Sequence, residues 1–148
     1  VLLHLAGAYL ALNDENEALL AYRQVIKIQP NHVPALNNVA WLSRDHNIGD
    51  AITYAERAFA LSPNDPYVLD TLGMLKLKQG NIDEAYQLIR NAADMSNDAR
   101  IHLHLADILY RQGNQPEALQ LVKDLAESLP GTEEGDQAKS MFEQWSLN

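Results

Sequence analysis

The stretch Leu69–Ala85, LDTLGMLKLKQGNIDEA, recurs in weaker form three more times along this chain of 148 residues. The copies are LLHLAGAYLALNDENEA at Leu2–Ala18, LNNVAWLSRDHNIGDA at Leu36–Ala51 and HLHLADILYRQGNQPEA at His102–Ala118. The four stretches end at Ala18, Ala51, Ala85 and Ala118, at intervals of 33, 34 and 33 residues. A unit of about 34 residues that reads as helix, turn and helix is typical of a helical repeat array.

Composition narrows the class of protein further. Apolar residues make up 47% of the chain, which suffices for a packed core. The net charge of −9 argues against a nucleic-acid partner, because phosphate binding needs a basic patch.

Without cysteine the chain has no disulfide or thiolate metal site, and no apolar run approaches the roughly 18 residues of a membrane span. The sequence starts at Val1, inside a helical pattern, so we interpret it as a fragment of a longer protein whose compartment stays open.

Repeat boundaries follow from the turns between helices. We expect a single domain with repeats at about residues 1–31, 32–65, 66–98 and 99–131, followed by a capping helix at about 132–147. Stacked repeats leave their last apolar face bare, and a helix with one apolar stripe would cover it. That stripe is formed by Ala138, Met141, Phe142 and Trp145. No such cap precedes Val1, which leaves that end exposed or paired with a second copy.

Capping residues and apolar spacing predict the individual helices. The turn before each second helix pairs an Asn or Asp with an acid three residues on, as in a capping box. The pairs are Asp14/Glu17, Asn47/Asp50, Asn81/Glu84 and Asn114/Glu117. Asp65 and Pro66 predict another helix start. Helical spacing predicts buried stripes, among them Leu2, Leu5, Ala6 and Tyr9 in the first helix and Ala85, Leu88, Ile89, Ala92 and Met95 in the third repeat.

The pattern resembles the tetratricopeptide repeat, whose signature contains a Leu–Gly pair, a tyrosine, an alanine, a later aromatic residue and a proline. The Leu–small pairs are Leu5–Ala6, Val39–Ala40, Leu72–Gly73 and Leu105–Ala106. Tyr9 matches the signature tyrosine, whereas Ser43, Lys76 and Leu109 stand at that position in the other repeats. The resemblance implies an all-α fold, a right-handed α-solenoid of four helix pairs, and a role in protein–protein interaction without cofactor, metal or catalysis.

A narrower resemblance concerns ALNNVAWL at Ala35–Leu42, YAERAFAL at Tyr54–Leu61 and VLDTLG at Val68–Gly73. These phrases are similar to tetratricopeptide lipoproteins of bacterial exopolysaccharide and protein-sorting systems. That similarity implies a scaffold in the bacterial periplasm or cell envelope that gathers secretion or assembly partners.

The tetratricopeptide resemblance implies a concave groove lined by the first helix of each repeat, where a peptide or a partner helix docks. The expected groove residues are Asn37, Asn38, Trp41, Arg44, Tyr67, Asp70, Met74, Lys78, Arg100, His104, Asp107 and Arg111, with His4, Gly7 and Asp45 beside them. The basic residues outnumber the acidic ones in this set, so we expect a local charge of about +1 and a preference for polar peptides or acidic motifs. Alternatively, these side chains only solvate the inner face, and Trp41 and Met74 only fill space between repeats.

Three other functions compete with peptide binding. The first is carbohydrate binding, in which sugar rings stack on Trp41, Tyr67 and Tyr110 and sugar hydroxyls bind to Asn37, Asn38 and Asp70. Self-assembly through the uncapped N-terminal end is the second. Capture of a chaperone C-terminus is disfavoured, because only Asn38 stands at a matching clamp position.

Catalytic and metal-binding patterns are absent from the sequence. His102 and His104 are two residues apart, which directs them to different faces of a helix. The acids Glu133, Glu134 and Asp136 are accounted for by the dipole at the start of the last helix. No nucleophile and base are readable together, so an enzyme is not expected.

Overall fold

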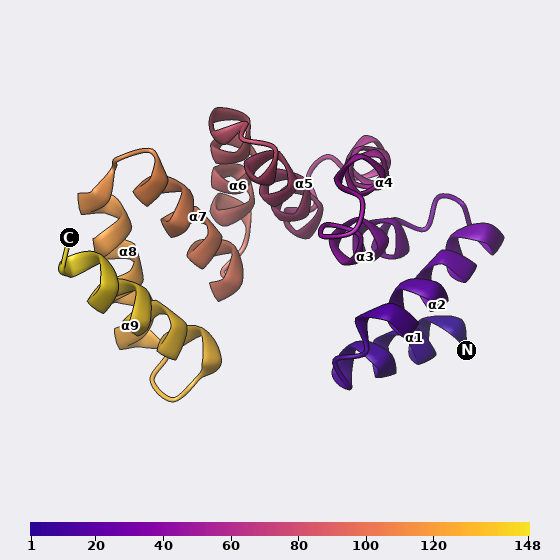
Figure 1. The fold of residues 1–148 in the computed structure, drawn as a ribbon, viewed down its shortest axis with the longest axis horizontal. Helices are drawn as coiled ribbons and strands as arrows, with labels where there is room; N and C mark the ends of the chain where they lie inside the picture. Colours follow the sequence, from indigo (N-terminus) through magenta and orange to yellow (C-terminus); the bar gives the residue numbers. More distant parts are fainter.

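The computed structural model describes residues 1–148 and contains nine α-helices and no strand (Figure 1). The helices are α1 (Leu2–Ala11), α2 (Glu15–Ile28), α3 (Val33–Leu42), α4 (Ile48–Leu61), α5 (Pro66–Lys78), α6 (Ile82–Met95), α7 (Ala99–Arg111), α8 (Gln115–Ser128) and α9 (Glu133–Ser146). The expected all-α repeat fold with a helix after the fourth pair is confirmed.

The helices form an arc of hairpins, with the two termini at opposite ends (Figure 1). Each odd-numbered helix from α1 to α7 packs on the helix that follows it. Contacts also join α3 to α5, α5 to α7 and α7 to α9. These inner helices therefore form the concave layer of the arc, and the even-numbered helices lie outside them.

Helix starts are determined by short polar side chains. Asp14 accepts a hydrogen bond from the backbone N–H of Glu17, and Asn47 accepts one from Asp50. Asp65 accepts from the N–H groups of Tyr67 and Val68, as its place before Pro66 predicts. Such a cap typically stabilises a helix by about 1 kcal/mol.

Two of the four expected capping boxes are wrong. The side chains of Asn81 and Asn114 accept no hydrogen bond from the helices that they precede. The Asn114 amide instead donates to the carboxylate of Glu117 at 2.7 Å. Both turns are closed by the backbone, since the N–H of Asn81 donates to the carbonyl of Lys76, five residues earlier, after Gly80 with a positive φ of 88°.

Small residues carry the contacts between neighbouring helices. The alanines that end the four related stretches are fully buried: Ala18, Ala51, Ala85 and Ala118. A Cβ on Gly73 would lie 2.5 Å from Cγ1 of Ile89, so α5 and α6 approach closely at this point. At the C-terminal end, Ala138, Met141, Phe142 and Trp145 of α9 pack against buried residues of α7 and α8.

Two expected core positions are exposed. Leu5 is 43% exposed because none of the nine helices covers this side of α1. Met95 is 48% exposed at the last position of α6, and Ala93 packs in the core with Ile101 of α7 instead. Several further apolar residues on α1 and α2 or beside them are exposed, namely Val1, Leu3, Leu12, Leu20 and Ile28.

None of the nine helices has both the length and the apolarity that a membrane crossing requires.

Candidate functional site

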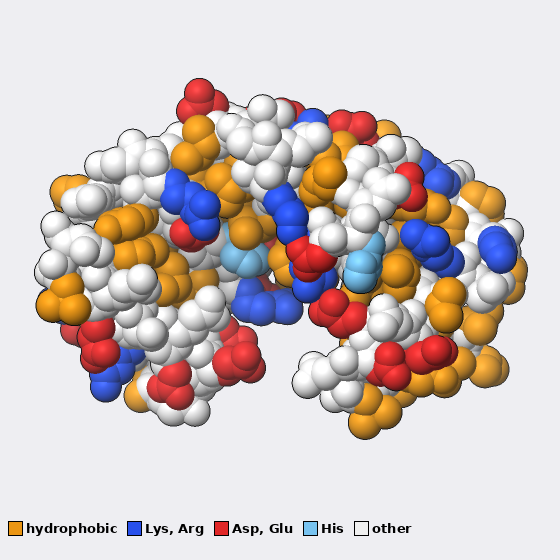
Figure 2. Space-filling model, in the orientation of Figure 1, with side chains coloured by type: hydrophobic (Ala, Val, Ile, Leu, Met, Phe, Trp, Pro, Cys, Tyr) orange, Lys and Arg blue, Asp and Glu red, His pale blue; other side chains and the backbone are white.

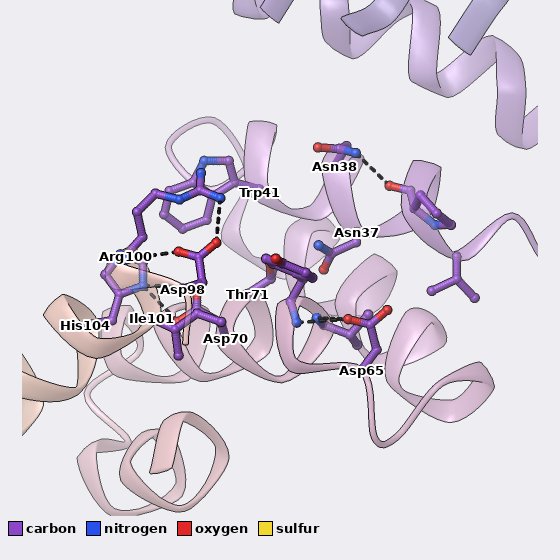
Figure 3. Close-up of a pocket in the computed structure, with 14 residues that line it drawn as sticks. Asn37, Asn38, Trp41, Asp65, Asp70, Thr71, Asp98, Arg100, Ile101 and His104 are labelled. Atoms are coloured by element: carbon purple, nitrogen blue, oxygen red, sulfur yellow. Dashed lines mark hydrogen bonds and ion pairs between the residues drawn. The ribbon is translucent and has the colours of Figure 1, made fainter. Parts of the chain in front are cut away.

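A cavity of about 390 Å³ opens on the concave side, where α3, α5 and α7 begin (Figure 3). Fourteen residues line it: Val33, Pro34, Asn37, Asn38, Trp41, Asp65, Tyr67, Val68, Asp70, Thr71, Asp98, Arg100, Ile101 and His104. They come from the first helices of three consecutive repeats and from the capping residues of two of them. An extended segment lying along the arc would therefore contact all three repeats.

Seven of the twelve expected groove residues line this cavity: Asn37, Asn38, Trp41, Tyr67, Asp70, Arg100 and His104. The other five, Arg44, Met74, Lys78, Asp107 and Arg111, lie outside its wall. Met74 packs against the core cluster of the third and fourth repeats. Of the twelve expected groove residues, seven therefore lie together in one cavity. The other five lie elsewhere on the inner layer of helices.

The cavity floor contains a hydrogen bond between repeats. Nδ1 of His104 lies 2.8 Å from Oδ1 and 3.0 Å from Oδ2 of Asp70 (Figure 3). The neighbouring His102 instead places its Nε2 2.8 Å from the carbonyl oxygen of Ser96. The two histidines therefore lie in different surroundings, as their spacing predicts, and His104 links α7 to α5.

Trp41 lies between two charged or polar side chains. The guanidinium carbon of Arg44 is 4.5 Å from the centroid of the indole ring, in cation–π geometry. The imidazole of His104, two repeats further along, is 6.3 Å from the ring centroid at a tilt of 38°. Trp41 is partly buried and lines the cavity, so it both packs between repeats and borders the groove.

The expected local charge of +1 is wrong, because the structure adds carboxylates to the inner surface (Figure 2). Glu15 binds Arg44 at 3.3 Å, and Asp98 binds Arg100 at 3.5 Å. Asp65 also lines the cavity without a basic partner. Four basic residues were expected on this surface: Arg44, Lys78, Arg100 and Arg111. The structure places six carboxylates near them, those of Glu15, Asp45, Asp65, Asp70, Asp98 and Asp107.

Each of these four cations has a carboxylate partner. Arg44 also lies 3.4 Å from Asp45, Lys78 pairs with Asp45, and Arg111 lies 2.9 Å from Asp107. A carboxylate ligand would have to displace one of these partners. The inner surface therefore does not favour the acidic motifs that the sequence suggested.

Asp98 and Arg100 shape the electrostatics of the cavity mouth. Partial burial raises the pKa of the Asp98 carboxyl, but hydrogen bonds from the Arg100 side chain and backbone N–H outweigh it, so the pKa is lowered. The bond to Asp98 raises the pKa of Arg100 against the opposing effect of burial, and the charges of Asp70 and Glu134 add to the increase. One guanidinium thus interacts with three carboxylates.

Asn37 and Thr71 present polar atoms to the cavity that make no hydrogen bond within the chain. Oδ1 of Asn37 is buried and unpaired. Thr71 is only 6% exposed and lines the cavity, yet its hydroxyl is in none of the side-chain hydrogen bonds. A buried acceptor without a partner is costly, so Oδ1 of Asn37 marks a place where a bound donor would be favoured.

Sequence reasoning missed Asp65, Asp98, Thr71 and Ile101 as cavity residues. The sequence identifies Asp65 only as a helix cap, and it assigns the other three no role in the groove. The missing information was that the inner helices meet at their N-terminal ends, which brings their caps into the groove. The capping aspartates expected before α5 and found before α7 were the available signal.

Tyr110 lies away from the cavity. Its ring stacks on Trp145 of α9 at 4.3 Å between centroids and 7° between planes. One face of the phenol is therefore covered by α9, which leaves Trp41 and Tyr67 as the aromatic residues of the cavity.

Comparisons with known families agree with this architecture. The model described as anaphase-promoting complex, cyclosome, subunit 3 matches residues 44–125, more than half of the chain, and the tetratricopeptide repeat model matches residues 1–32. The chain belongs to the tetratricopeptide repeat family. A TPR repeat-containing protein of Pseudomonas aeruginosa is 29% identical over 97 residues, which are 64% of this chain and 16% of that protein. This tetratricopeptide chain therefore corresponds to a small part of that relative's length.

Solved structures show the same fold. A thermophilic TPR protein of Thermus thermophilus superposes with a TM-score of 0.82 at 17% identity, over 99% of this chain and 80% of that one. An O-GlcNAc transferase of Thermobaculum terrenum gives 0.77 at 24% identity, over 86% of this chain and 25% of the enzyme. MamA protein gives 0.67 at 17% identity, over 99% and 85%. At these identities the likeness concerns the tetratricopeptide fold alone.

Proposed function

We propose that this tetratricopeptide chain binds an extended segment of a partner protein in the cavity formed by α3, α5 and α7. Tetratricopeptide folds generally mediate protein–protein interactions without catalysis. The observation that carries the proposal is the cavity itself, in which three repeats present Trp41, Thr71 and His104 to one space of about 390 Å³.

The chemistry of the wall suits a peptide. Trp41 and Tyr67 offer apolar surface with a polar edge, as binding hot spots do. The unpaired Oδ1 of Asn37 is an acceptor, and the Thr71 hydroxyl both donates and accepts. A peptide backbone carries the matching donors and acceptors at every residue.

Selection from a displayed library of random peptides against the immobilised chain, followed by calorimetric titration of the selected peptides, tests this proposal. We expect Trp41→Ala and Asn37→Ala each to weaken binding, Trp41→Ala by about tenfold or more. Leu61→Ala, at an exposed position of the outer helix α4, is the matched control and should change affinity less than about twofold. Circular dichroism checks that each variant is folded. Failure to select any saturable binder, or equal losses in all three variants, would contradict the proposal.

A narrower role as an envelope scaffold for exopolysaccharide or secretion partners is suggested only by the three sequence phrases at Ala35–Leu42, Tyr54–Leu61 and Val68–Gly73. The similar proteins from Pseudomonas, Thermus and Thermobaculum add no support for that role. Tyr110 does not join the proposed sugar-stacking set either, because it packs on Trp145. Peptide binding is therefore the function that we carry forward, and a glycan titration without signal would separate the two.

Self-assembly through the N-terminal end is the remaining candidate. Its support is the exposed apolar surface of α1 and α2, where Val1, Leu2, Leu3, Val25 and Ile28 line a shallow groove. Light scattering that shows a strict monomer over a wide concentration range would remove it.

A further inference from the structure

We infer that the segment bound in this cavity is basic, with a lysine or arginine side chain that contacts Asp70 and Trp41. This inference rests on the proposed peptide-binding function and names the chemical class of its ligand.

The charges around the cavity favour a cation. Its wall holds three aspartates, Asp65, Asp70 and Asp98, and a single arginine, Arg100. Asp65 and Asp98 cap α5 and α7, so they offset the partial positive charges of about +0.5 at those two helix ends. Asp70 is not a cap, and its only side-chain partner is His104. The charge of Arg100 also acts on Asp70, but no hydrogen bond or ion pair joins these two side chains, so the Asp70 carboxylate can still accept a hydrogen bond from a ligand cation.

The surroundings extend this negative field beyond the cavity. Glu133 and Glu134 of α9 line a shallow groove that continues from the cavity through the shared residues Asp98 and Arg100. The chain as a whole has a net charge of −9. Basic segments are thus attracted at long range as well as in the cavity, and acidic segments are repelled.

The aromatic residues add a second reason. Arg44 stacks 4.5 Å from the centroid of Trp41, which shows that this indole accommodates a guanidinium group. The same indole also lines the cavity. A ligand guanidinium or ammonium group there would combine a cation–π contact with a charged hydrogen bond to Asp70. The unpaired groups of Asn37 and Thr71 would bind the ligand backbone or flanking polar atoms.

Peptides selected from the random displayed library are the probe. We expect them to be enriched in lysine and arginine over aspartate and glutamate. Replacing the arginines of a selected peptide by citrulline, which keeps the shape and removes the charge, should weaken its binding about tenfold. Raising the salt concentration should weaken the arginine form more than the citrulline form.

Two variants that each remove one negative charge test whether the preference for a cation comes from the cavity or from the net charge of the chain. Asp70→Asn keeps an acceptor for His104 and should weaken the arginine peptide about tenfold while leaving the citrulline peptide within twofold. Asp124→Asn, at an exposed site on α8, should leave both peptides within twofold.

Selected peptides that are neutral or acidic would overturn this inference and leave the peptide-binding proposal standing. An unchanged affinity after the citrulline replacement, or equal effects of Asp70→Asn and Asp124→Asn, would also overturn it. Selection of no binder at all would instead contradict the proposed function on which it rests.

Discussion

Two glycines show how strongly the effect of one residue depends on its neighbours. A Cβ on Gly73 would lie 2.5 Å from Ile89, whereas nothing lies within 4 Å of the corresponding point on Gly7. We expect Gly73→Ala to lower the free energy of unfolding by about 1–3 kcal/mol through overpacking. Gly7→Ala should raise it by about 0.5–1 kcal/mol, because alanine is the better helix former. Urea denaturation measures both, and a stabilised Gly73→Ala would contradict the close packing of α5 on α6.

The capping residue Asp98 should make part of the stability depend on pH. Its pKa is lower in the folded chain than in the unfolded one, because hydrogen bonds from Arg100 outweigh the effect of burial. The stabilisation is therefore complete above the unfolded value of about 3.9 and is lost as the pH falls through the folded value. Asp98→Ala should cost about 1 kcal/mol at neutral pH, and the difference from the native chain should shrink below about pH 4.

Thr132 supplies the control for Asp98, because its hydroxyl caps α9 and does not titrate in this range. Thr132→Ala should cost a similar amount at neutral pH, and this cost should persist in acid. Urea titrations of both variants at neutral and acidic pH test this. Equal pH dependence of the two differences would mean that the charge of Asp98 contributes nothing to folding.

At the scale of the helices, the sequence predicted more than it missed. The repeat spacing, the start of α5 at Pro66 and the apolar stripe of α9 were readable, because each follows from local spacing or capping chemistry. Leu5 and Met95 were misjudged because burial depends on what neighbouring helices cover. The carboxylates of the cavity were missed for the same reason, since Asp65 and Asp98 meet in the groove only when the inner helices are stacked.

The last helix shows what a single aromatic pair contributes. Trp145 stacks on Tyr110 and packs against the core clusters of α7 and α8. We expect Trp145→Ala to lower the free energy of unfolding by about 2–3 kcal/mol, less than for a fully buried tryptophan because the ring is only partly covered. Trp145→Phe keeps an aromatic ring on Tyr110 and should cost less, about 1 kcal/mol. Urea denaturation decides, and equal losses in the two variants would argue against the stacking contribution.

At the scale of the whole molecule, the two ends of the arc differ in how they are covered. The last helix, α9, packs on both α7 and α8, whereas α1 packs on α2. Three exposed apolar residues, Val1, Leu3 and Leu5, lie on α1 or directly before it, whereas at the other end Leu147, directly after α9, is exposed. In a linear array, each repeat is stabilised by its neighbours, so the end with fewer contacts should open first.

Hydrogen exchange of the native chain tests this difference between the ends. We expect the amides of α1 to open with a free energy at least about 2 kcal/mol lower than those of α5, which has a repeat on each side. The amides of α9 are the internal control, since this helix is also terminal but covered by two others, and they should be protected more than those of α1. Equal protection of α1 and α5 would show that the array unfolds as one cooperative unit. The exposed face of α1 would then not lower the free energy of opening of that helix.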